Sequence, residues 1–119
     1  MAKIKLAEFK PKNAKELADA IVNDVSEIAG ATVPKLATSI LPHIKSLSAS
    51  TFQSATLFKQ GKITQAELDR ATLDQEAYLN SILLMALFST YVLAQEVLNG
   101  VMALIVAAIK SWTGVELNF

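Results

Sequence analysis

The segment from residue 77 to residue 109 constrains the fold of this chain more than any other feature. It contains 33 residues and one formal charge, the carboxylate of Glu96. As one helix it would be about 50 Å long, which exceeds the bilayer hydrocarbon core of about 30 Å. A water-exposed helix needs a polar majority around its circumference, so this segment predicts a helix buried nearly all round by protein or by lipid.

One narrow face of this predicted helix differs from the rest of its circumference. Small and polar side chains fall on that face when successive residues are placed at helical spacing, whereas Leu, Ile, Val and Phe occupy the other faces. Small residues allow the backbone of a second helix to approach closely. We therefore predict a helix-packing seam at Ser81, Ser89, Glu96, Gly100, Ala103 and Ala107.

Glu96 is the one carboxylate in this segment, and three roles are open to it. It can reach a solvated groove or bond to a neighbouring helix, which is the ordinary role of such a residue. It can serve as an ion or proton carboxylate inside a membrane, where acids are costly and usually functional. It can also set the register between subunits, because a buried polar group disfavours wrong alignments.

Two shorter parts of the segment match the thickness of a bilayer. Residues 77–95 carry no charge, and residues 91–112 have an aromatic residue at each end. Aromatic and basic side chains are enriched where a membrane helix meets water. Tyr91, Lys110 and Trp112 are therefore the candidates for membrane-interface residues.

The rest of the sequence predicts amphipathic helices. Asn13 is a suitable N-cap for a helix over residues 14–29, in which apolar residues recur at spacings of three and four. Thr32 resembles the N-cap of a second helix over residues 33–60, kinked near Pro42 because proline lacks the backbone N–H donor.

A capping box opens the last part of the chain, with Thr64 as N-cap and Glu67 three residues later. Helices are predicted at 65–98 and 101–112, on the expectation that a break occurs at Asn99–Gly100. Without that break the two segments form one very long helix.

The predicted fold class is all-α, a helical bundle or helical hairpin of three to four helices with one long apolar C-terminal helix. Residues 1–13 form a lysine-rich arm, and residues 14–119 form a single helical domain. The arm lacks the apolar core of a secretory signal, so we expect no secretory signal there, and the compartment stays open.

The composition argues against most catalytic and nucleic-acid-binding functions. The chain has 11 basic and 11 acidic residues, one His and no Cys, and it has no phosphate-binding glycine motif. Its single histidine, His43, has no partner with metal-ligand spacing. We expect no enzyme activity, no cofactor, no metal, no small-molecule substrate and no nucleic-acid partner.

The preferred hypothesis is a non-enzymatic helical structural subunit. It self-assembles as a component of an oligomer, filament, virion or pore, or it inserts its long apolar helix into a membrane. The alternative is a soluble four-helix bundle that binds an apolar ligand or a partner helix. A third hypothesis is a peripheral membrane adaptor held to anionic lipid by the lysine-rich arm.

Overall fold

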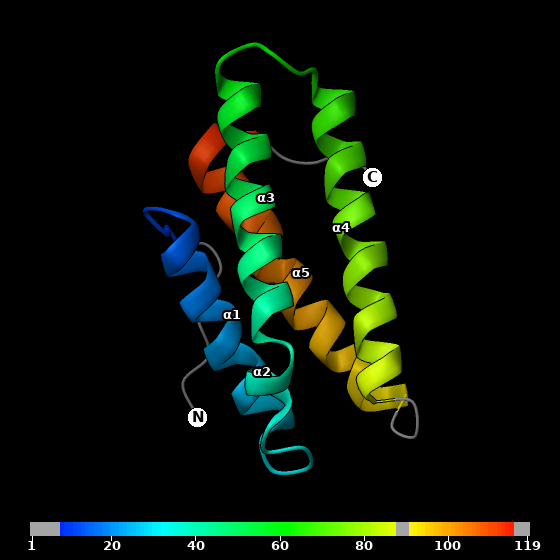
Figure 1. Cartoon of the computed structure of the whole chain (residues 1–119). Helices are drawn as coiled ribbons and strands as arrows, with labels where there is room; N and C mark the ends of the chain where they lie inside the picture. The colour runs from blue at the N-terminus through cyan, green and yellow to red at the C-terminus, as the bar shows by residue number, and fades with distance from the viewer. Residues whose placement is uncertain (1–7, 88–90, 116–119) are drawn as a thin grey trace.

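Five helices and no strand make up the part of the chain that the computed structural model describes, residues 8–87 and 91–115. In order, the helices are α1 (Ala14–Ala29), α2 (Leu36–Ser39), α3 (Leu41–Lys59), α4 (Gln65–Ala86) and α5 (Tyr91–Thr113). The predicted all-α class and the long apolar C-terminal helix are therefore confirmed (Figure 1).

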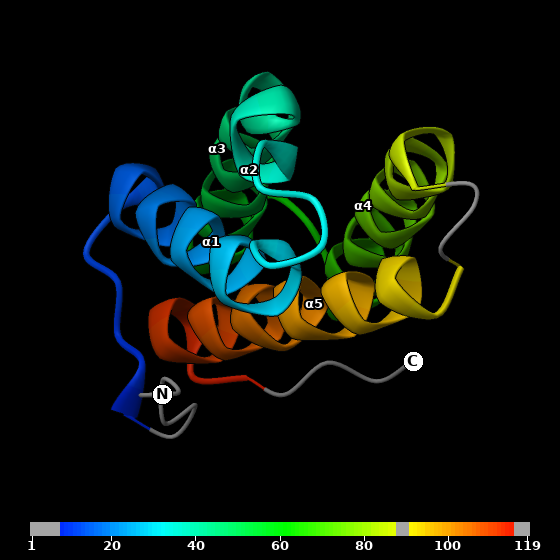
Figure 2. The same ribbon diagram turned by 90° about the horizontal axis from the view of Figure 1, so that it is seen from below.

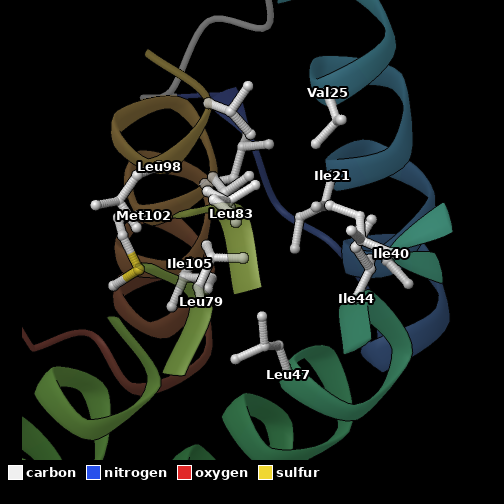
Figure 3. Packing of buried hydrophobic residues seen from close by; sticks show 14 of the residues in the cluster. Ile21, Val25, Ile40, Ile44, Leu47, Leu79, Leu83, Leu98, Met102 and Ile105 are labelled. Carbon is white, nitrogen blue, oxygen red and sulfur yellow. The ribbon is translucent and has the colours of Figure 1, made fainter. Parts of the chain in front are cut away.

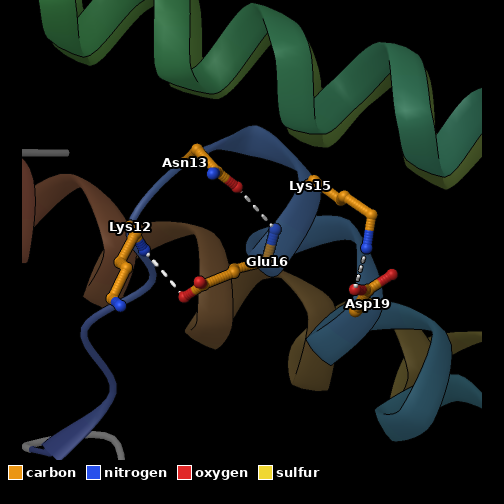
Figure 4. A network of polar contacts seen from close by, with 5 residues as sticks. All are labelled: Lys12, Asn13, Lys15, Glu16 and Asp19. Atoms are coloured by element: carbon orange, nitrogen blue, oxygen red, sulfur yellow. Dashed lines mark hydrogen bonds and ion pairs between the residues drawn. The ribbon is translucent and has the colours of Figure 1, made fainter.

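Helix α1 begins where the sequence predicts. The Glu16 backbone N–H donates to Asn13 Oδ1 at 3.0 Å, and the Lys12 backbone N–H donates to Glu16 Oε1 at 2.9 Å. The first bond satisfies a donor that the first helical turn leaves without an intrahelical partner, and the second ties the preceding residue to that turn. One turn further on, Lys15 and Asp19 form an exposed ion pair of 3.2 Å (Figure 4).

The second predicted helix, residues 33–60, is two helices. The break falls at Ile40, and Pro42 lies in the first turn of α3, where its missing N–H removes no helical hydrogen bond. The predicted start at Thr32 was wrong, because α2 begins at Leu36 after a run of turns. Val33 precedes a proline, and that position disfavours the helical conformation.

The predicted break at Asn99–Gly100 was also wrong. Helix α4 ends at Ala86, and α5 continues through Gly100 to Thr113. Gly100 fits against α1 because it has no side chain: a Cβ there would overlap Asp24 Oδ2 and come within 2.9 Å of Ile28 Cδ1. The glycine marks a close approach of two helices, and packing there outweighs its low helix propensity.

The capping box at the start of α4 is confirmed. The Glu67 backbone N–H donates to Thr64 Oγ1 at 3.1 Å, and the Thr64 backbone N–H donates to Glu67 Oε1 at 2.9 Å. Gly61, which has a φ of +73°, forms the turn that precedes α4.

Replacing Thr64 by alanine is expected to lower the free energy of unfolding by about 1 kcal/mol, because the cap bond to Glu67 is lost. Urea denaturation followed by circular dichroism measures this change. Thr32→Ala is the matched control, since Thr32 is exposed and caps no helix in this structure. Equal effects of the two substitutions would contradict the assignment of the cap.

Helix α5 packs against three of the other four helices. Helices α1, α3 and α4 contact it, and in Figure 2 all three lie on one side of it. Val97, Val101 and Ile105 of α5 have no exposed surface, and neither do Ile21 of α1 and Leu83 of α4. Figure 3 shows these helices contributing side chains to one apolar core. The apolar C-terminal segment thus supplies a large part of the core.

The contact between α3 and α4 is more polar than the rest of the interior. The Thr51 hydroxyl donates to Gln75 Oε1 at 2.9 Å, and both side chains are buried. His43 Nδ1 and the Tyr78 hydroxyl share a hydrogen bond of 2.6 Å. His43 thus has a phenolic partner that helical spacing could not reveal, because Tyr78 is 35 positions away.

Candidate binding groove on helix α5

The face of α5 turned away from the core forms the floor of an open groove of about 980 Å³. Its floor consists mainly of small and apolar side chains of α5. The walls come from the segment before α1 and from α4, and charged side chains stand at the rim. The lining residues are Phe9, Lys10, Glu76, Asn99, Met102, Ala103, Val106, Ala107, Lys110 and Ser111.

Trp112 fixes the wall that precedes α1. Its indole N–H donates to the Pro11 carbonyl oxygen at 2.6 Å, and its ring stacks edge-on against Phe52 of α3 with centroids 4.9 Å apart. These contacts hold Pro11 against the end of α5, and so place Phe9 and Lys10 beside the groove. The structure therefore gives Trp112 an anchoring role within the fold.

The residues of the predicted packing seam lie in different parts of the structure. Ala103 and Ala107 line the groove, whereas Gly100 lies against Asp24 of α1. Glu96 is exposed on α5, one turn before the groove residue Asn99. Ser81 is exposed on α4, where its hydroxyl donates to the Ala77 carbonyl oxygen at 3.1 Å, and Ser89 lies outside the described residues.

The residues predicted to form the seam do not share one helix, because α4 ends at Ala86 and α5 begins at Tyr91. Ser81 and Glu96 lie on different helices, so helical spacing no longer relates their faces. Of the predicted seam residues on α5, Glu96, Ala103 and Ala107 share one face, whereas Gly100 lies against α1. That face carries Glu96, Asn99, Ala103, Ala107 and Lys110, and we refer to these five residues as the outer face of α5.

Of the two predicted bilayer placements, residues 77–95 cannot form one span, because α4 ends at Ala86. The other placement coincides with α5, which is the helix among the described residues long and apolar enough to cross a membrane. Half of its most apolar window is buried inside the fold. Tyr91 is 62% exposed and Lys110 is also exposed.

Charge is distributed unevenly along the outer face. Glu96 and Lys110 stand fourteen positions apart on α5, which corresponds to about 21 Å along the helix axis. Lys10 lies at the Lys110 end, because the adjacent Pro11 is bonded to Trp112. The face is therefore acidic at its N-terminal end and basic at its C-terminal end, with Ala103 and Ala107 between.

The walls of the groove could not be predicted from the sequence. Phe9, Lys10 and Glu76 are distant from α5 in sequence and carry no motif, so only the packing brings them together. Among residues 8–87 and 91–115, no three His, Asp or Glu side chains gather as metal ligands. The groove provides apolar contacts along its floor and charged groups at its rim. This arrangement suits binding.

Comparison of the chain with protein-family models, with curated protein sequences and with solved structures finds no match. The proposals that follow therefore depend on the residues and their arrangement.

Proposed function

We propose that this protein is a non-enzymatic helical subunit that self-associates through the outer face of α5. The single observation that carries the proposal is the open groove over Ala103 and Ala107. These residues leave room for another backbone at the middle of a three-turn apolar floor. Helices α1, α3 and α4 all lie on one side of α5 (Figure 2), and Glu76 of α4 stands at the edge of the groove.

The packing of α5 favours a protein partner over a bilayer. Val97, Val101 and Ile105 have no exposed surface, because the core of the chain already covers them. Insertion of α5 into lipid would separate it from three helices and expose their apolar faces, at a cost of about 25 cal/mol per Å². The outer face of α5 carries the exposed Glu96, Asn99 and Lys110 and the half-buried Ala103 and Ala107.

A second candidate function is the binding of an apolar small molecule. A volume of about 980 Å³ suits such a ligand, because ligand pockets usually span about 300–1,000 Å³. The lysines at one end would pair with an anionic group of the ligand. We place this second because the groove is open and has small residues at its floor, which suits a helix better than an enclosed ligand.

Light scattering on protein purified without detergent tests the proposed function, alongside extraction of the protein from cell membranes. We expect a discrete soluble dimer or small oligomer at raised protein concentration. Recovery only with detergent would contradict the proposal in favour of a membrane span. A soluble chain that stays monomeric at its highest attainable concentration would contradict self-association.

A further inference from the structure

We propose that a second cavity, between α3 and the C-terminal end of α5, binds a small planar molecule that carries an anionic group. The cavity has a volume of about 400 Å³ and shares no lining residue with the groove on α5. Binding there does not depend on self-association. The proposal is carried by the two aromatic rings, the two lysines and the hydrogen-bonding groups that line the cavity.

Two aromatic side chains form the apolar part of the cavity. Phe52 and Trp112 contact each other edge to face, with ring centroids 4.9 Å apart, and both side chains are only half-buried. Both rings line the cavity, so each keeps surface that the chain does not cover. Aromatic rings favour contact with other rings in stacked or edge-to-face geometry. This part of the cavity therefore suits a planar apolar group.

The residues of α3 that line the cavity form one stripe. They recur at spacings of three and four, which places on one face of the helix Phe52, Ala55, Thr56, Lys59 and Gln60. The stripe is apolar at Phe52 and polar at Lys59, and these two positions are about 10 Å apart along the helix axis. A molecule of one or two rings with one polar group spans that distance. The volume of about 400 Å³ lies toward the lower end of the usual range for ligand pockets.

Two of the polar groups beside the cavity are already bonded within the chain. The Trp112 indole N–H donates to the Pro11 carbonyl oxygen at 2.6 Å. The Thr56 hydroxyl donates to the Phe52 carbonyl oxygen at 2.9 Å. The donors that remain belong to basic and amide side chains, so the ligand has to supply the acceptor.

The cavity is positively charged. Lys12 and Lys59 line it, and no acidic residue of the described chain does. Among residues 8–87 and 91–115, no carboxylate forms an ion pair with either ammonium group. Lys59 also complements the dipole at the C-terminal end of α3, whereas Lys12 lies outside that helix. Glu16 accepts the backbone N–H of Lys12 and does not line the cavity. An anionic group on the ligand therefore meets two cations and no competing carboxylate.

Titration followed by heteronuclear NMR tests the site directly, because Trp112 is the only tryptophan in the chain and gives one indole N–H signal. The probes are naphthoate and naphthalenemethanol, which share a ring system and differ in charge. We expect naphthoate to shift the indole signal saturably, with a dissociation constant about fivefold lower than that of naphthalenemethanol. Two exposed ion pairs account for a difference of this size.

Substitution of the two lysines separates charge from apolar contact. In a double variant with Lys12→Gln and Lys59→Gln, the dissociation constant of naphthoate should rise about fivefold and match that of naphthalenemethanol, whose own value should not change. Lys10→Gln is the matched control, since Lys10 lines the groove on α5 and not this cavity. Naphthoate should bind this control as it binds the wild type.

Three results would overturn the inference. The first is an indole signal that does not shift, and the second is equal binding of the two probes by the wild type. The third is a loss of naphthoate binding in Lys10→Gln as large as in the double variant, because it would place the probe in the groove on α5.

Discussion

A leucine at position 100 is expected to lower the free energy of unfolding by about 1–3 kcal/mol, the usual cost of forcing extra atoms into a packed interior. Even the first carbon of a side chain there would overlap Asp24 Oδ2 and crowd Ile28 Cδ1. Leucine adds three further carbons at the point where α1 and α5 come closest, so the helices must separate.

Urea denaturation of Gly100→Leu and Gly100→Ala separates bulk from helix propensity. The alanine variant should change the free energy of unfolding by less than about 1 kcal/mol. Its gain in helix propensity of about 1 kcal/mol offsets the movement of two flexible side-chain ends. A leucine variant as stable as the wild type would show that α1 and α5 do not approach at Gly100.

Replacing both Ala103 and Ala107 by leucine is expected to abolish self-association while the chain stays folded. Both alanines are half-buried at the floor of the groove, so leucine side chains fill it without entering the core. A partner helix could then no longer reach the backbone of α5. Sedimentation velocity should show a monomer for this variant, with the helical circular dichroism spectrum of the wild type.

Val92→Ser is the control for this experiment. Val92 is 71% exposed near the start of α5, outside the groove, so its removal tests whether any exposed apolar residue affects association. We expect this variant to associate like the wild type. If Val92→Ser breaks the dimer and the double leucine variant does not, then the surface around the α4–α5 corner, where Met85 is 81% exposed, is the interface.

Local signals in the sequence predicted the starts of α1 and α4, because capping depends on residues a few positions apart. Asn13 and the pair Thr64 and Glu67 make their predicted bonds. The apolar spacing of α1 was equally informative, since Leu17 and Ile21 have no exposed surface. These features depend on neighbours along one helix, and the sequence displays them directly.

The end of α4 at Ala86 was not predicted, because nothing local in the sequence marks it. The described chain leaves α4 at Leu87, in a stretch without glycine or proline, whereas the glycine at position 100 lies inside a helix. Folding back at the end of α4 lets α5 bury Val101 and Ile105 against α1 and α3, and that gain outweighs local propensity.

The division of this segment into α4 and α5 also changes how much apolar surface remains to be covered. One unbroken helix from residue 65 to 112 would have more apolar surface than the two helices before it can cover. Two separate helices pack against one another, and the outer face of α5 is among the surfaces that they leave uncovered. The sequence could indicate the small residues of that face but not the walls, because Phe9 and Glu76 reach it through tertiary packing.

Small-angle X-ray scattering over a concentration series tests the central claim, that a compact helical bundle pairs through α5. The chain has a mass of 12.8 kDa and a Cα radius of gyration of 13.9 Å. The account predicts that the scattering mass rises to twice the chain mass, with a radius of gyration well above 13.9 Å. A particle that keeps the mass and radius of a single chain at every concentration would contradict it.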